Sequence, residues 1–252
     1  MNFNKNTIDA RTSELAMSKN IASLRGINNN YLKWNLSLFP MKKGQNILDL
    51  GCGAGFYYHD IMAYRPSLYY GADSSEIFLK EVIRLSDGRA NSKTMLLDLL
   101  DPAAPERFRG IVFHAILCFD VLEHIKDDRK ALKNIRSIIE ATGKGMLFLR
   151  VPALQMIYGQ NDLAIGHYRR YSRELLKKLM EECGFRVERS GYQNIFGIIP
   201  WWIIGRLLKR DLAVSAEEGR FFNSLVPLLQ RMEHVFPPPV GLSLYCISRI
   251  VE

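Results

Sequence analysis

The stretch NILDLGCGAGF, residues 46–56, decides the fold of this chain. Residues 46–50 form a short, mostly apolar run, which is typical of a buried parallel strand. The turn that follows contains only small residues. A helix is expected over residues 56–64. Gly51, Gly53 and Gly55 permit unusual backbone dihedrals and leave amide groups open to a ligand. The stretch therefore predicts a site for a nucleotide-like cofactor.

The spacing of the glycines separates two kinds of cofactor. A dinucleotide-binding turn has glycines at its first, third and sixth positions. Counted from Gly51, the sixth position is Phe56, so this pattern is incomplete. A cofactor without a phosphate group, lying against bare peptide beside the Asp49 carboxylate, fits better. A generic strand-to-helix turn is the alternative, and the rest of the chain decides between them.

The composition is that of one globular α/β domain with a full core. The chain has 252 residues, a formal net charge of +8 and a pI of about 9.3, which favours an anionic partner such as nucleic acid, an acidic membrane surface or a phosphorylated substrate. The cysteines are far apart and indicate a reducing cytoplasm, and no metal site is expected. They are Cys52, Cys118, Cys183 and Cys246.

No targeting or membrane-spanning segment is expected. The N-terminal residues are polar with charges of both signs, unlike a signal peptide. The longest uncharged apolar run, residues 195–205, contains Pro200 and is shorter than the ~18 to 20 residues of a membrane-spanning helix. We expect a cytoplasmic protein with one domain over residues 1–252, including a helical segment at 1–40 and an apolar, helical insertion at 192–240.

Acidic residues end the second and third expected strands. Asp73 ends residues 68–73, and Ser74 or Ser75 caps the following helix, residues 76–85. Asp73 follows Gly51 at about the 20-residue distance of a carboxylate that binds ribose hydroxyls. The alternative is a carboxylate that interacts with the helix dipole. Residues 93–97 end in Asp98-Leu99, which can bind adenine or simply open a loop.

The remaining elements complete an alternating pattern. Strands are expected at 111–119 and 145–151, with a helix at 127–140, so that five strands alternate with helices and form a parallel sheet with right-handed crossovers. Ser172 caps a helix that Gly184 ends. Strands at 185–191 and 242–251 follow, separated by a helix at 217–236. Two helices, 13–24 and 31–39, precede the first strand, with a break at residues 28–30.

Taken in order, the motifs DLGCGAG, GADSSE, LLDLL, FDVLEHI, LFLRVP and GHYRRYSRELLKKLMEECGFRVE resemble consecutive motifs of class I S-adenosylmethionine-dependent methyltransferases. The resemblance covers roughly residues 30–195 and the last strand. It implies an α/β fold with a Rossmann-like, seven-stranded, mostly parallel sheet, an antiparallel final strand and helices on both faces. The HYRRY element is similar to a branch of bacterial methyltransferases associated with glycan and natural-product pathways.

The resemblance also implies roles for particular residues. Phe119, at the end of the fourth strand, would pack near the sulfonium, and the N-terminal helices would cover the site, which makes Arg25, Tyr31 and Trp34 candidates for contact with it. Trp34 can equally pack against the core. The implied contacts to S-adenosylmethionine and to its product S-adenosylhomocysteine are Asp49, Gly51, Cys52, Gly53, Gly55, Asp73, Ser74, Asp98, Leu99, Phe119 and Tyr31.

Two histidines are candidates for a general base. His124 follows the fourth strand at the rim where the transferable methyl group would lie, or it caps or packs beside Glu123. His167, with Tyr168 beside it, is the second candidate. Arg169 and Arg170 would bind an anionic part of the acceptor or only fix a loop.

The apolar stretch at residues 195–210 combines Trp201 and Trp202 with basic residues. This combination is typical of a segment at a membrane interface, and it suits a dimer interface or a hydrophobic acceptor tunnel equally well. We expect weak association with anionic membranes or a lipid-like acceptor. The oligomeric state is left open.

The expected activity is O-methylation of a small-molecule, sugar or lipid-linked acceptor. Methylation of RNA is the enzymatic alternative, although the (Asp/Asn)-Pro-Pro-aromatic motif of amino-methylating enzymes and the Pro-Cys of cytosine-carbon enzymes are missing after Phe119. A partner subunit that keeps the fold without the chemistry is the other alternative. The intact glycine turn and Asp73 argue against it.

Overall fold

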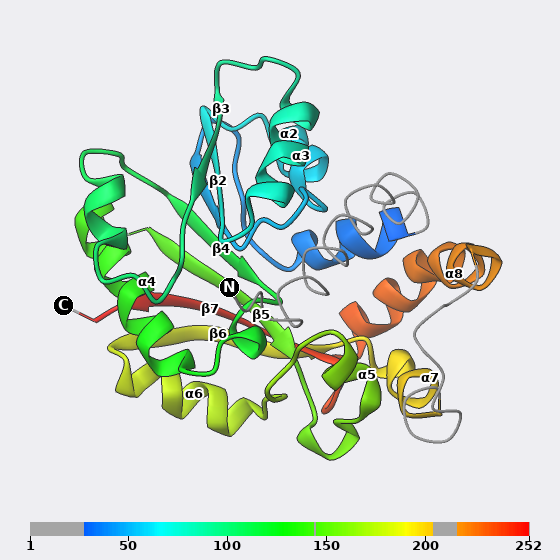
Figure 1. Ribbon diagram of the computed structural model, residues 1–252. Coiled ribbons are helices and arrows are strands. Elements are labelled where there is room, and N and C mark those ends of the chain that lie inside the picture. Colours follow the sequence, from blue (N-terminus) through cyan, green and yellow to red (C-terminus); the bar gives the residue numbers. More distant parts are fainter. Residues whose placement is uncertain (1–27, 144, 204–215, 252) are drawn as a thin grey trace, which may run out of the picture.

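The computed structural model describes residues 28–143, 145–203 and 216–251 (Figure 1). One seven-stranded sheet has the order β3-β2-β1-β4-β5-β7-β6. All neighbouring strands pair in parallel except β7, which is antiparallel to both β5 and β6. The strands are β1 (Asn46–Leu50), β2 (Leu68–Asp73), β3 (Ser92–Leu96), β4 (Ala115–Phe119), β5 (Met146–Pro152), β6 (Phe185–Gln193) and β7 (Ser243–Ile250).

Helices connect the strands, as the alternating sequence pattern predicts. The α-helices are α2 (Tyr58–Ala63), α3 (Glu76–Ser86), α4 (Asp128–Thr142), α5 (Gln160–Ala164), α6 (Arg173–Glu182), α7 (Ile198–Trp202) and α8 (Ala216–Val235). Short 3-10 helices are η1 (Ala104–Phe108), η2 (Leu122–His124), η3 (Gln155–Ile157) and η4 (Ile195–Gly197). Residues 28–37 form a further helix.

Polar side chains fix where three of these helices begin. Ser75, Asp127 and Ser172 each precede the first turn and accept a hydrogen bond from a backbone N–H two or three residues into the helix. The expected caps at Ser75 and Ser172 are therefore confirmed. Gly184, with φ of 82°, follows α6 in the left-handed conformation that ends helices.

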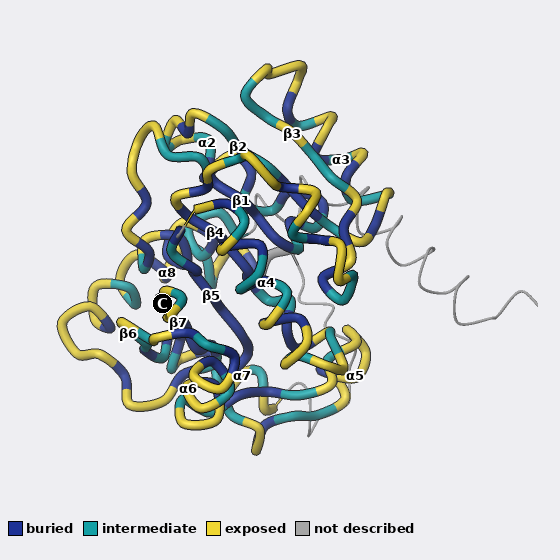
Figure 2. Tube along the Cα trace, turned by 90° about the vertical axis from the view of Figure 1, so that its left-hand side faces the viewer, coloured by how far each residue is buried: buried dark blue, intermediate teal, exposed yellow. Residues whose placement is uncertain are grey.

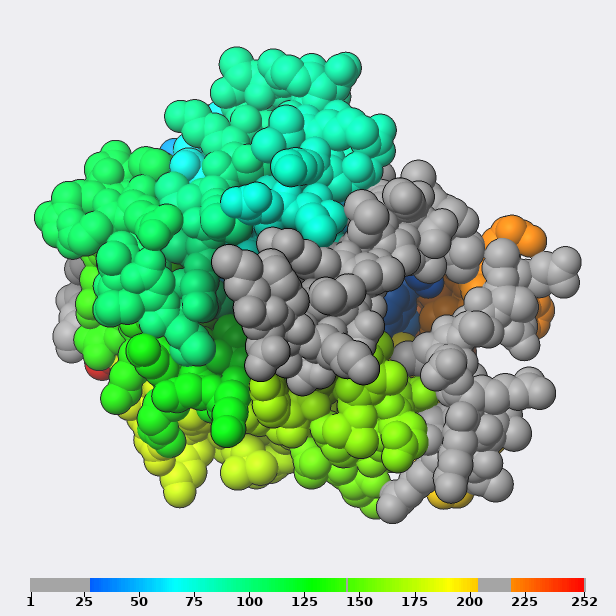
Figure 3. All heavy atoms as spheres, in the orientation of Figure 1, coloured from blue at the N-terminus to red at the C-terminus, as the bar shows by residue number. Residues whose placement is uncertain are grey.

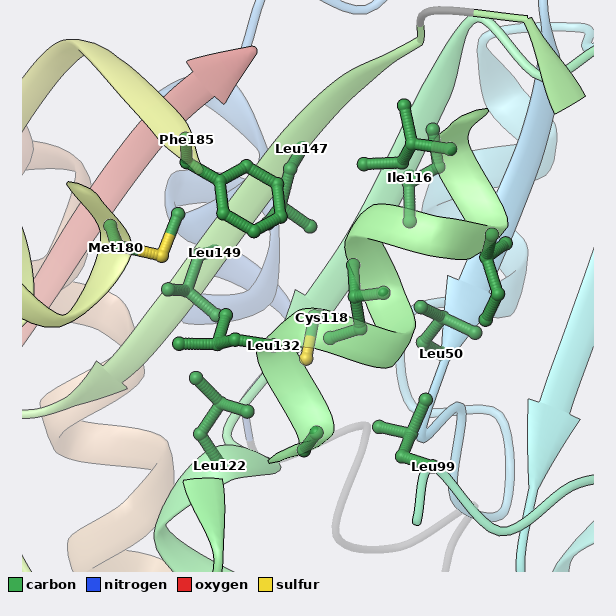
Figure 4. Close-up of a cluster of buried hydrophobic side chains, with 14 of the residues drawn as sticks. Leu50, Leu99, Ile116, Cys118, Leu122, Leu132, Leu147, Leu149, Met180 and Phe185 are labelled. Carbon is green, nitrogen blue, oxygen red and sulfur yellow. The ribbon is translucent and has the colours of Figure 1, made fainter. Parts of the chain in front are cut away.

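The core lies on both faces of the sheet. In Figure 2 the central strands β1, β4 and β5 are almost entirely buried, which explains their continuous apolar sequences. On one face, Leu132 of α4 and Met180 of α6 join Phe185 of β6 in a core cluster that packs these helices against the sheet (Figure 4). On the other face, Phe39 stacks on Phe119 and Phe148, with ring centroids 4.8 and 5.1 Å apart.

Several expected boundaries were wrong. The fourth strand begins at Ala115 rather than at residue 111, because the amide of Phe113 bonds outside the sheet, to the Thr142 carbonyl. The helix expected at 56–64 is shorter, since the glycine turn extends to Tyr57. Residues 28–30 are helical, whereas a break between two helices was expected there. The side chain of Asn223 in α8 accepts hydrogen bonds from the Asn30 and Tyr31 amides and so satisfies the first turn of this helix.

Parts of two expected segments lie outside the described residues. These are the helix at 13–24 with Arg25, and the basic residues that follow Ile203. In α7, Trp201 lies beneath the Arg170 guanidinium, 4.8 Å from the ring centroid, and Trp202 is 41% exposed. None of the helices in the described ranges is long and apolar enough to span a bilayer.

Candidate active site

The glycine turn after β1 is pinned to the end of β2. The amides of Gly51 and Cys52 donate to the Ala72 carbonyl at 2.7 and 3.1 Å. Gly51 has φ of 71°, and a Cβ there would lie 2.3 Å from Val121, so no other residue fits without a shift. A Cβ on Gly53 would meet nothing within 4 Å. The turn is thus closely packed against Val121 at Gly51, whereas space for a ligand is left at Gly53.

Asp73 joins this turn to the second strand. Its carboxylate accepts hydrogen bonds from the Gly53 amide at 2.8 Å and from the Ser75 amide at 2.9 Å. Ser74, between them in sequence, is exposed. The carboxyl ends of β1 and β2 therefore form one continuous surface made of a carboxylate and a bare peptide turn.

Asp49 is buried directly behind the turn. It is 4% exposed and accepts a hydrogen bond of 3.1 Å from the Tyr69 hydroxyl. Burial raises the pKa of Asp49 to about 7; the bond from Tyr69 opposes this rise and the Asp73 carboxylate adds to it. Burial and the two carboxylates also raise the pKa of the Cys52 thiol, so Cys52 stays a neutral packing residue. A cationic ligand here would relieve the repulsion between the two carboxylates.

The loop after β3 is ordered by its own hydrogen bonds. Asp98 accepts from the Leu100 amide at 2.8 Å, and the Leu99 carbonyl accepts from the side chain of Asn134 in α4 at 2.8 Å. Asp98 is exposed, whereas Leu99 belongs to the core. An exposed carboxylate on a fixed loop beside β1 and β2 is what an adenine contact needs.

A buried polar network lies beyond Phe119, and sequence reasoning missed it. Arg150, in the middle of β5 and 5% exposed, forms an ion pair with Asp120 and donates to the Tyr31 hydroxyl at 2.7 Å and to Ser243 Oγ at 2.8 Å. Asp120 has φ of 55°. The single charge within the apolar motif LFLRVP was the signal that could have revealed it. Tyr31 thus belongs to this polar network, whereas Trp34 is buried in the core.

The structure brings His124 and His167 together. Their ring centroids are 4.7 Å apart, in an edge-to-face arrangement. Burial and the neighbouring His167 lower the pKa of His124 below its ordinary value, so this imidazole is neutral at pH 7. The fully buried Glu123 lies beside the pair, and burial together with the Asp120 charge raises its pKa well above the ordinary value.

The other residues of the HYRRY element have protein partners. Arg169 pairs with Asp128 at 2.6 Å, and the buried Arg170 pairs with Asp162 at 2.7 Å. An acceptor anion would have to displace these carboxylates to reach either guanidinium. The ring of Tyr168 is 55% exposed, and its amide donates to the Glu123 carbonyl at 2.7 Å.

These features fit the cofactor that the sequence resemblance implies. S-adenosylmethionine carries hydroxyls, an adenine ring and two positive charges, and no phosphate. The site offers Asp73 for hydroxyls, Asp98 for the adenine edge, an open peptide face at Gly53 and a buried carboxylate at Asp49 for positive charge. Within the described residues, the glycine turn has neither a lysine nor a further glycine placed as in phosphate-binding loops.

Comparison with protein families gives a match to a methyltransferase domain over residues 25–190. Among curated proteins, a ubiquinone biosynthesis O-methyltransferase from Coxiella burnetii is 28% identical over 40% of this chain and 42% of its own length. A tRNA U34 carboxymethyltransferase from Campylobacter lari is 27% identical over 57% of this chain and 47% of its own length. The chain thus spans less than half the length of these curated relatives.

A similar fold occurs among solved structures. A chain in the complex between the Haloferax volcanii Trm112 methyltransferase activator and a methyltransferase matches with a TM-score of 0.62, over 97% of both chains. The sequences are 14% identical, so this likeness concerns the fold alone. The expected mostly parallel, seven-stranded sheet with an antiparallel final strand is confirmed by the strand pairings of this chain.

Proposed function

The chain belongs to the methyltransferase domain family, its fold and cofactor are those of S-adenosylmethionine-dependent methyltransferases, and we propose that it methylates an oxygen atom of a small-molecule, sugar or lipid-linked acceptor. One observation carries the proposal most directly. The glycine turn and Asp73 touch, through the hydrogen bond of 2.8 Å from the Gly53 amide. Two separate sequence motifs therefore form a single ligand surface, and the paired histidines lie beyond the next strand.

The cofactor side of the proposal assigns roles to residues at the strand ends. Asp73 binds the ribose hydroxyls, Asp98 and the Leu99 amide bind adenine, and the open face at Gly53 with Asp49 receives the amino-acid end. Phe119 packs near the sulfonium, where an apolar ring excludes water. When bound, S-adenosylmethionine supplies an electrophilic methyl group, so the chain itself contributes alignment and activation of the acceptor.

On the acceptor side, we place the reactive hydroxyl beside His124. Because its imidazole is neutral at pH 7, it has a lone pair to offer, and His167 supports it from the adjacent segment. Tyr168 lies at the exposed side of this pair. In this arrangement Asp120 is held by its ion pair with Arg150, which also positions the Tyr31 hydroxyl by a hydrogen bond of 2.7 Å.

A lipid-linked acceptor is supported by apolar side chains on α8. Phe221, Leu228 and Val235 recur at helical spacing and are 58 to 68% exposed, and Trp202 of α7 is also exposed. We propose that this face contacts an anionic membrane or the lipid part of the acceptor. Co-sedimentation with vesicles containing anionic phospholipid tests this, and equal recovery with neutral vesicles or none would reject it.

Calorimetry with S-adenosylmethionine and S-adenosylhomocysteine tests the cofactor site first. We expect both to bind, and Asp73→Ala to weaken binding while the exposed His234→Ala in α8 does not. The acceptor is then identified by transfer of a labelled methyl group to a panel of phenols, sugars and quinone precursors. Absence of cofactor binding at millimolar concentration would overturn the proposal.

RNA methylation is the second candidate, because the chain carries a net charge of +8 and resembles a tRNA-modifying enzyme at similar identity. A transcribed tRNA in the same acceptor panel separates the two. Label in the tRNA alone, with salt-sensitive binding, would replace O-methylation of small molecules by RNA methylation. Cofactor binding with no label in any acceptor would favour a partner subunit without chemistry.

A further inference from the structure

Three side chains with metal-binding atoms meet behind the candidate acceptor position. Glu123 and His124 belong to η2, directly after β4, and His167 precedes α6. One ligand atom from each of them lies within 4.8 Å of the others. Nε2 of His167 is 3.7 Å from Oε1 of Glu123. Ligand atoms that share one zinc ion lie roughly 3.3 to 3.5 Å apart, because zinc–ligand bonds are about 2.0 to 2.2 Å long.

The Glu123 carboxylate is buried without a hydrogen-bond donor among the described residues. Its side chain is fully buried, and neither oxygen has a hydrogen-bond partner among the described residues. Burying a carboxylate without compensation is costly. A cation held between Glu123 and the two imidazoles would compensate it.

His167 is oriented as a metal ligand is. Its Nδ1 lies 3.0 Å from Oδ1 of Asp162, whose carboxylate is itself held by Arg170 Nε at 2.7 Å and the Gly159 amide at 3.0 Å. In the tautomer with the proton on Nδ1, His167 donates this bond to the Asp162 carboxylate, whose charge is balanced by the Arg170 guanidinium. The lone pair of Nε2 then faces Glu123. A carboxylate that fixes a histidine in this way is a recurrent partner of metal-bound histidine.

The backbone holds the two segments in place. The Tyr168 amide donates to the Glu123 carbonyl at 2.7 Å, and the His167 amide donates to the Asp162 carbonyl at 2.8 Å. The three candidate ligands are therefore positioned by hydrogen bonds that do not depend on a metal ion. Such preorganisation favours binding because little order is lost when the ion arrives.

We propose that Glu123, His124 and His167 bind one divalent transition-metal ion, with Asp162 as the residue that orients His167. Two imidazoles and one carboxylate match zinc and its neighbours in the first transition row, whereas magnesium and calcium prefer oxygen ligands. The cysteine spacing gave no sign of this site, because its ligands are histidine and glutamate.

Three protein ligands leave one coordination position open. His124 is the most exposed of the three, so the open position faces the side on which we place the acceptor. In this role, which depends on the proposed O-methylation, the ion would hold the acceptor hydroxyl and lower its pKa, and the hydroxyl proton would pass to solvent. The two histidines would then act through the ion.

Metal binding is tested without cofactor or acceptor. Metal-free protein is titrated with Zn²⁺ by calorimetry, and Co²⁺ is added as a spectroscopic probe of histidine coordination. We expect one ion per chain, loss of the Co²⁺ spectrum in His167→Ala and Glu123→Gln, and a 10- to 100-fold weaker affinity in Asp162→Asn. His234→Ala is the matched control and is expected to bind as the wild type does.

Two results would overturn the inference: no stoichiometric ion in the wild type, which would mean that Glu123 is simply buried in its neutral form, or unchanged binding in His167→Ala. Thermal unfolding of each variant without metal shows whether it is folded, and Glu123→Gln keeps the shape of the side chain. A protein that binds Zn²⁺ but ignores S-adenosylmethionine would reject the proposed function alone. A protein that binds the cofactor but not the metal would reject only this inference.

Discussion

Replacing Asp49 by asparagine is expected to stabilise the protein and at the same time weaken its binding of S-adenosylmethionine. The carboxylate is buried, has one hydrogen-bond donor in Tyr69 and lies near the charge of Asp73. Asparagine has the same shape and can still accept from the Tyr69 hydroxyl, but it carries no charge. The substitution therefore removes the repulsion that the cofactor's positive charge would otherwise relieve.

The size of the effect follows from the two pKa values of Asp49. Its pKa is about 7 in the folded protein against 3.8 for a free side chain, so between these values the folded state retains a proton that the unfolded state has released. Stability from this group is therefore complete below pH ~4 and is lost as the pH rises to about 7. Between pH 5 and 8 the wild type should lose about 2 to 3 kcal/mol relative to Asp49→Asn.

Urea unfolding of both proteins at pH 5, 6, 7 and 8 measures this difference. Tyr69→Phe provides a second test: without its donor, the Asp49 carboxyl should titrate at higher pH, so the loss of stability should still begin near pH ~4 but continue to higher pH than in the wild type. In parallel, calorimetry at pH 8 should show roughly tenfold weaker cofactor binding in Asp49→Asn, the factor that corresponds to one unit of pKa. A difference between the two unfolding curves that does not change with pH would refute the reasoning.

Three further outcomes follow from the geometry of the site. Gly51→Ala should destabilise the fold, because its Cβ would lie 2.3 Å from Val121. Adding Val121→Ala should recover about 1 to 3 kcal/mol of the free energy of unfolding in urea. No recovery would show that the backbone dihedral alone is responsible for the loss. Asp73→Ala should weaken cofactor binding about 10- to 100-fold in calorimetry, because it loses charge-assisted hydrogen bonds. Asp73→Asn keeps an acceptor oxygen and should lose less, and wild-type affinity in Asp73→Asn would contradict a role for the charge. Arg150→Met should cost about 1 to 3 kcal/mol, because the Tyr31 and Ser243 hydroxyls lose their donor and the partly exposed Asp120 loses its partner. The double variant with Asp120→Asn should regain part of this in thermal unfolding, and a neutral single substitution would contradict a coupled pair.

Most of the sheet and of the cofactor half of the site could be predicted from the sequence because the signals are local. Gly51 and Asp73 each follow directly from the strand that positions them, and parallel strands bring their carboxyl ends to one edge. The boundary error at residues 111–114 has a different origin. Those residues are apolar enough for a strand, but the Phe113 amide bonds to Thr142 outside the sheet.

The residues on the acceptor side of the site could be predicted only one by one, without their contacts to each other. Nothing near His124 in the sequence indicates that His167 lies against it, because the contact depends on how the segment after β5 folds back over η2. The pairing of Arg150 with Asp120, and its bond to Tyr31, likewise joins residues far apart in the chain. Such tertiary contacts leave no periodic pattern, and the only trace is a charged residue in an apolar strand.

The position of β7 in the sheet has a consequence for how the protein is made. β7 is inserted between β5 and β6, and its register with β5 pairs Ser243 with Pro152. Its residues are mostly buried, and little of this red strand reaches the surface in the view of Figure 3. During synthesis on the ribosome, β5 and β6 emerge long before the strand that separates them. The nascent chain must therefore hold one unpaired strand edge on β5 and another on β6, so translation stalled before residue 243 should leave an intermediate that attracts chaperones.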